Sequence, residues 1–169
     1  MFFDVSYIDT LMYITTKYSE EVTICVKFNN LHLNNLDIEV FLYTAHNKDK
    51  FAAALFAVLR NDIIRINDFY STVFNKGYGS AVFSAFLIVV AKIREQYPVR
   101  YIVGELVPKD YDYWEKSIHI YSNANFYCDK YSIPLKSHSV VDRKYSFSEF
   151  LDIYPELKEK GAKFRIYLD

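Results

Sequence analysis

The stretch FNKGYGS, residues 74–80, separates two segments of opposite pattern and decides the fold. Before it, Ile63–Ser71 is rich in β-forming residues and predicts a strand. After it, residues 80–95 are apolar almost all round, which predicts a helix packed in the interior. Gly77 and Gly79 let the backbone turn tightly and approach a ligand closely. The N–H groups of such a turn, together with a helix N-terminus, favour a phosphate or pyrophosphate group.

Upstream of this stretch the sequence predicts antiparallel strands in succession. Alternating or continuous apolar positions place them at residues 21–28, 32–45 and 51–59. Asn29-Asn30 predicts a turn between the first two strands, and Asn61-Asp62 predicts a hairpin into the next strand. Residues 8–18 are ambiguous and fit a short helix.

Downstream, residues 99–106 predict a second buried strand. It follows a crossover helix, so we expect it to lie parallel to Ile63–Ser71. Residues 108–124 predict another helix, and residues 164–168 predict a closing edge strand. The sequence therefore predicts an α+β fold in one domain, residues 1–169, with a mixed, mostly antiparallel sheet flanked by helices.

Composition narrows the function classes. Lys and Arg number 20 against 21 Asp and Glu, so the chain lacks the basic excess of a nucleic-acid-binding protein. Cys25 and Cys128 have no metal-type spacing, and their scarcity favours a reducing, cytoplasmic setting without a bound metal. The longest apolar stretches fall short of the roughly 20 residues that a membrane span needs. We therefore expect no nucleic-acid or membrane partner.

Three kinds of phosphate site compete for residues 74–80. A P-loop is disfavoured because Lys76 precedes Gly77 and no Ser or Thr follows it in the required place. A dinucleotide fingerprint is disfavoured because Val82 stands where the third glycine is needed. The third kind is an acyl-CoA site.

The sequence around the predicted acyl-CoA site resembles a known family. Residues 67–70, NDFY, lead into residues 75–80, NKGYGS, and together they resemble motif A of the GNAT superfamily of N-acetyltransferases. Residues 119–126, HIYSNANF, resemble the ending of the family's later helix. In two places the chain departs from the family pattern: Phe74 stands where Arg or Gln is usual, and Asn125 replaces a glycine.

The resemblance implies a fold and a cosubstrate. The strand ending near Ser71 and the strand ending near Leu106 would form a central parallel pair that splays apart, and the pantetheine arm of acetyl-CoA would lie in the gap. Gly104, inside the second strand, fits a bulge or a close backbone approach. The implied cofactor-binding residues are Phe69, Tyr70 and Ser71 for the arm, and Asn75, Lys76, Gly77, Tyr78, Gly79 and Ser80 for the pyrophosphate.

The resemblance also implies an acetyl transfer to an amine. Tyr121 would hydrogen-bond the departing thiolate. Asp68 and Glu105, near the ends of the two central strands, are the candidate bases for the amine, and a water chain is the alternative. The partners would be acetyl-CoA and an unidentified primary amine, and the C-terminal strands leave a homodimer open. The alternative is a non-catalytic CoA-binding or interaction module with the same fold, which Phe74 favours.

Overall fold

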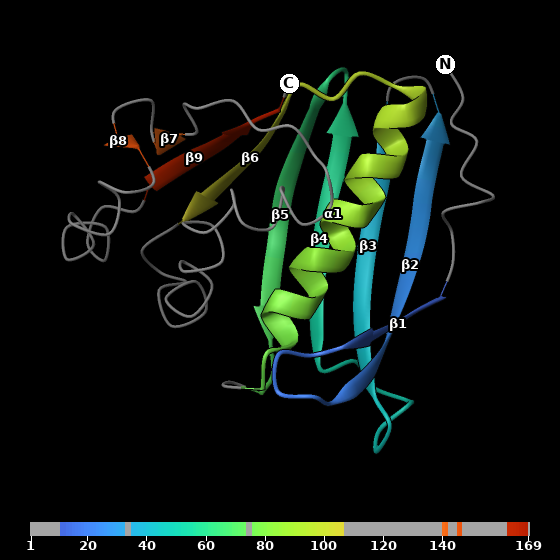
Figure 1. Ribbon diagram of the computed structural model, residues 1–169. Coiled ribbons are helices and arrows are strands. Elements are labelled where there is room, and N and C mark those ends of the chain that lie inside the picture. The colour runs from blue at the N-terminus through green and yellow to red at the C-terminus, as the bar shows by residue number, and fades with distance from the viewer. Residues whose placement is uncertain are drawn as a thin grey trace.

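The computed structural model describes residues 11–32, 35–73, 76–106, 140–141, 145–146 and 162–168 (Figure 1). The strands are β1 (Leu11–Thr15), β2 (Glu21–His32), β3 (Asn35–Thr44), β4 (Ala53–Arg60), β5 (Ile63–Ser71), β6 (Tyr101–Leu106), β7 (Val140–Val141), β8 (Tyr145–Ser146) and β9 (Ala162–Tyr167). The described helix is α1 (Tyr78–Gln96). The second helix predicted at residues 108–124 lies outside the described residues.

All described strands belong to one mixed sheet, ordered β1-β2-β3-β4-β5-β6-β9-β7-β8. Neighbouring strands run antiparallel except β5 and β6, which run parallel. Helix α1 forms the crossover between these two strands and lies along one face of the sheet (Figure 1). The predicted fold class, with its central parallel pair, is confirmed.

The core lies between α1 and the sheet face that it covers. In β3 every second residue is fully buried, namely Leu36, Ile38, Val40 and Leu42. Phe83 and Phe86 are the largest fully buried side chains of α1. Burying one such side chain stabilises the fold by about 1.5–3 kcal/mol. The buried side chains of β3 and those of α1 therefore belong to one continuous core.

Three predictions about elements were wrong. Leu11–Thr15 is a strand paired with β2, not part of a helix, and Met12 and Ile14 pack against the core. The predicted turn at Asn29-Asn30 lies inside β2, where the pairing with β3 becomes irregular. The C-terminal strand is not at an edge, because β9 pairs with β6 on one side and with β7 on the other.

Candidate functional site

The parallel pair of β5 and β6 opens into a gap after a short contact. Pairing runs from Ile63 with Tyr101 to Arg65 with Val103 and then stops. Residues 66–71 of β5 and 104–106 of β6 continue without pairing with each other. Figure 1 shows β6 turning away from β5. The facing backbone groups of β5 therefore need partners other than β6, such as water or a ligand.

A β-bulge lies in β5 where the gap opens. Phe56 of β4 pairs with Asp68 and Ala57 pairs with Ile66, so Asn67 is the extra residue. Asn67 and Asp68 are both exposed and interrupt the alternation of β5. Bulges re-aim side chains and are common beside active sites.

Of the two roles predicted for Gly104, a bulge or a close backbone approach, the bulge was wrong. Gly104 is buried, and β6 pairs with β9 through it without a shift in register. The bulge of the parallel pair therefore lies in β5, and the close backbone approach at Gly104 stays a prediction.

The N-terminus of α1 follows the end of β5. Gly77 is the N-cap residue in the left-handed conformation, with φ of 76°, and among the described residues no side chain caps the helix. The first intrahelical bond runs from the N–H of Ala81 to the carbonyl of Gly77, 3.1 Å apart. The N–H groups of residues 78–80 therefore lack intrahelical acceptors. With no acidic residue in the first turn, they present a positive helix end that suits an anion.

Gly77 and Gly79 have different structural roles. Gly77 needs the left-handed region, which glycine adopts without strain. Gly79 lies inside the first turn of α1, and no positive φ is found there. The prediction that both glycines shape one tight turn is thus confirmed only for Gly77.

The turn between β1 and β2 packs against this helix end. The Tyr78 hydroxyl, on a side chain only 6% exposed, donates to the Glu20 carboxylate at 2.8 Å from Oε2 and 3.0 Å from Oε1. A Cβ on Gly77 would lie 3.1 Å from Cγ of Lys17. Sequence reasoning missed this support, because residues 17 and 20 lie some sixty positions from the helix that they contact.

Tyr78→Phe is expected to lower the free energy of unfolding by about 1.5–3 kcal/mol, the contribution of a hydrogen bond to a charged group. Burial, then the hydrogen bond and charge of Glu20, raise the pKa of Tyr78 above its ordinary 10.0. The folded state therefore holds this proton more tightly. The protonated Tyr78 hydroxyl stabilises the fold fully below its pKa in the unfolded state, which is near 10. This stabilisation is lost as the pH rises through the higher pKa of Tyr78 in the folded state.

Denaturant unfolding at pH 7 and at stepwise higher alkaline pH checks this prediction. The difference in the free energy of unfolding between wild type and Tyr78→Phe should be constant at neutral pH and should shrink above pH 10. Tyr18→Phe is the matched control, because Tyr18 lies in the turn that holds Glu20 and its side chain is 61% exposed. A stability difference that stays constant at alkaline pH would show that the Tyr78 hydroxyl does not hold its proton through Glu20.

The predicted binding residues of β5 divide between its two faces. Phe69 is buried and stacks on Phe83 of α1, with ring centroids 6.2 Å apart. Tyr70 is half-buried on the opposite face, against Phe51 and Phe56. Burial first and the charge of Asp68 second raise the pKa of Tyr70. Both side chains pack against other rings, so at these two positions β5 can offer a ligand its backbone groups.

The other predicted site residues flank the gap and the helix end. Asp68 and Glu105 are exposed, one on each of the two diverging strands. The Ser71 hydroxyl donates to the carbonyl of Val73 at 2.6 Å, with the carbonyl of Ala52 3.3 Å from the same oxygen, and so helps to end β5. Lys76 is exposed beside the N-cap. Asn75 and Tyr121 lie outside the described residues.

Within the described ranges, no group of three or more His, Cys, Asp or Glu side chains is placed to hold a metal ion. Among the described residues, no helix combines the length and the hydropathy needed to cross a membrane.

Comparison with known proteins gives distant structural likenesses. No protein-family model matches the chain, and no curated protein matches it. A Bacillus subtilis acetyltransferase in complex with CoA is 12% identical, with 86% of this chain and 98% of that one covered and a TM-score of 0.41. A putative acetyltransferase from Sphaerobacter thermophilus is 5% identical, with 92% and 94% covered and a TM-score of 0.41.

A third likeness is to a tandem GNAT protein from the clavulanic acid biosynthesis pathway, in a structure solved without acetyl-CoA. It is 8% identical, with a TM-score of 0.36, and the match covers 64% of this chain but only 31% of that longer one.

Proposed function

We propose that the chain binds an acyl-CoA, with acetyl-CoA as the cosubstrate, and transfers the acyl group to a primary amine. One observation carries the proposal: the gap between β5 and β6 opens at the bulge of Asn67 and leads to the uncapped N-terminus of α1. A backbone edge and an anion site thus follow each other along a single stretch of chain.

The gap suits the pantetheine arm. Its amide groups would hydrogen-bond the unpaired edge of β5 as an added strand does. Residues 67–71 span about 13 Å at the usual rise of a strand, which is on the scale of an extended arm. The pyrophosphate would then meet the N–H groups of residues 78–80 and the exposed Lys76.

The reaction needs few groups from the protein. The amine, with an ordinary pKa of roughly 10, must lose a proton before its nitrogen attacks the thioester carbonyl. Asp68 and Glu105 are the proposed bases, from the two strands that border the gap. A backbone N–H freed at the bulge would stabilise the oxyanion. The C–S bond then breaks, and Tyr121 is proposed to hydrogen-bond the leaving CoA thiolate.

A turnover assay tests the enzymatic part. Acetyl-CoA is incubated with the protein and a panel of primary amines, and the free thiol of released CoA is measured. Amine-dependent thiol release supports the acyltransferase. Binding of acetyl-CoA without thiol release in the presence of any amine would favour the second candidate, a non-catalytic CoA-binding module. Phe74, which stands where Arg or Gln is usual, supports this second candidate.

A further inference from the structure

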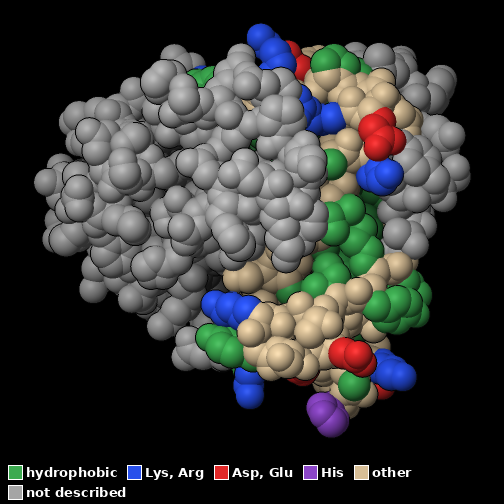
Figure 2. All heavy atoms as spheres, in the orientation of Figure 1, with side chains coloured by type: hydrophobic (Ala, Val, Ile, Leu, Met, Phe, Trp, Pro, Cys, Tyr) green, Lys and Arg blue, Asp and Glu red, His purple; other side chains and the backbone are tan. Residues whose placement is uncertain are grey.

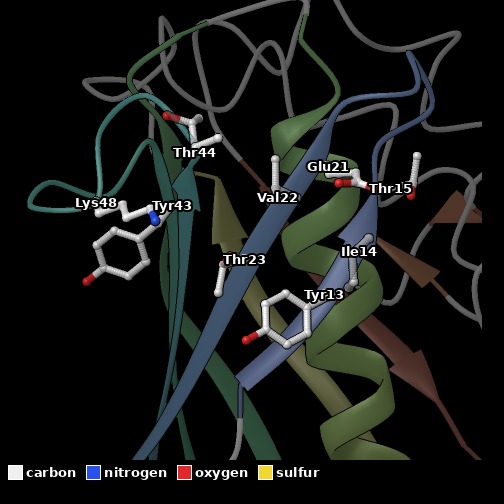
Figure 3. A pocket seen from close by; sticks show the side chains of 10 residues that line it. Tyr13, Ile14, Thr15, Glu21, Val22, Thr23, Tyr43, Thr44 and Lys48 are labelled. Atoms are coloured by element: carbon white, nitrogen blue, oxygen red, sulfur yellow. The ribbon is translucent and has the colours of Figure 1, made fainter.

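A separate pocket lies at the β1 side of the sheet, away from the gap between β5 and β6. It encloses about 650 Å³ and is formed by β1, β2, the end of β3 and the loop after β3. Figure 3 shows Tyr43 and Lys48 on one side, Tyr13, Thr15 and Glu21 on the other, and Thr23 between them. None of these residues takes part in the proposed acyl-CoA site.

Two tyrosines stand on either side of a small residue. Thr23 of β2 pairs with Tyr13 of β1 and with Tyr43 of β3, so the three side chains share one face of the sheet. Neighbouring strands lie about 4.8 Å apart, which places the two tyrosines about 10 Å apart across Thr23. A flat group can lie between the rings. The side chain of Tyr13 is 81% exposed, an unusual state for a large aromatic residue within a strand.

The two walls of the pocket carry opposite charges. Glu21 lies next to Thr15 on the Tyr13 side, and Lys48 lies on the Tyr43 side. Within the part of the chain that the structure describes, neither Glu21 nor Lys48 forms an ion pair. Each wall therefore offers one charge to a ligand, and the ligand that matches both carries a cation and an anion.

We propose that this pocket binds a planar zwitterion of the aromatic amino acid class. The ammonium group lies at Glu21 and the carboxylate at Lys48. The planar ring lies over Thr23 between Tyr13 and Tyr43, where ring contacts stabilise it. The hydroxyl groups of Thr15 and Thr44, which also line the pocket, accept or donate the remaining hydrogen bonds. This site does not depend on the proposed acyl transfer.

Three indole compounds separate the contributions of the two charges. L-tryptophan carries both charges, tryptamine lacks the carboxylate, and indole-3-propionate lacks the ammonium. Their dissociation constants are measured by calorimetry on the full chain without acetyl-CoA, so the result is independent of the acyl-CoA site. L-tryptophan should bind about two- to fivefold more tightly than either analogue, since exposed charge contacts contribute modestly.

Variants assign each charge and the ring. Glu21→Gln should abolish the advantage of L-tryptophan over indole-3-propionate, and Lys48→Gln its advantage over tryptamine. Tyr13→Ala should weaken all three compounds by about three- to tenfold. Both charged side chains and Tyr13 are exposed, so these variants should keep the circular dichroism spectrum of the wild type. Equal affinities for the three compounds, affinities unchanged in the variants, or no binding of L-tryptophan at millimolar concentration would overturn the proposal.

Discussion

Gly79→Val is expected to weaken acetyl-CoA binding at least about 100-fold, because two charge-assisted hydrogen bonds to the pyrophosphate contribute about 3–6 kcal/mol. Gly79 is the second residue of α1, and in the proposed site the chain approaches the phosphates closely there. A β-branched side chain there crowds the anion site. The fold itself should tolerate the change, since no positive φ is found at Gly79. Calorimetric titration with acetyl-CoA and thermal unfolding without it measure the two effects separately.

Gly77→Ala is the matched control. Gly77 has a φ of 76°, and holding alanine in that region costs about 1–2 kcal/mol. The new Cβ would also lie 3.1 Å from the flexible Lys17 side chain, which must move by a few tenths of an ångström. Gly77→Ala should therefore lower the melting temperature where Gly79→Val does not. The reverse pattern, with Gly79→Val unstable but normal in affinity, would make Gly79 a structural residue only.

Tyr121→Phe is expected to slow the acetyl-transfer step by up to roughly 10²–10⁴-fold, the range for a positioned proton donor. The substitution keeps the ring and deletes only the hydroxyl that would meet the leaving thiolate. A phenol with a pKa of roughly 10 is a slightly weaker acid than a thiol near 8.5, so a hydrogen bond alone would place the effect at the lower end. Single-turnover kinetics with an accepted amine measure this step apart from product release.

Tyr111→Phe serves as the control for this experiment. Its spacing puts it on the same predicted helix face as Tyr121, so it reports what losing a hydroxyl there does without the proposed role. An unchanged single-turnover rate in Tyr121→Phe would remove Tyr121 from the mechanism. A large loss of stability would do the same, because the hydroxyl would then be a buried structural partner.

The central part of the fold could be predicted because its signals are local. The alternation of Leu36, Ile38 and Val40 marks a strand with one buried face, as observed. The sharp change from Ile63–Ser71 to an apolar helix sets up the crossover, and a crossover forces β5 and β6 to be parallel. The helix N-terminus at Gly77 was predictable from the same stretch, since a glycine before a helix is visible in the sequence, and its role as an anion site stays a prediction.

The features that depend on distant pairing could not be predicted. Residues 8–18 are ambiguous in the sequence and fit a short helix, whereas pairing with β2 makes Leu11–Thr15 a strand. The bulge at Asn67 exists only relative to β4, so its position in β5 rather than at Gly104 required the register. The bond from Tyr78 to Glu20 and the pocket between Tyr13 and Tyr43 likewise arise from residues that only the folded sheet brings together.

Calorimetric titration and thermal unfolding with acetyl-CoA test the central claim most directly, because both report binding at the gap and helix end whatever the acceptor is. At a hundredfold excess over the dissociation constant, binding to the folded state adds about 2.7 kcal/mol. For a chain of this size we expect the melting temperature to rise by about 5–10 °C, and the rise to vanish in Gly79→Val. No heat of binding and no shift at millimolar acetyl-CoA would contradict the acyl-CoA site and, with it, both candidate functions.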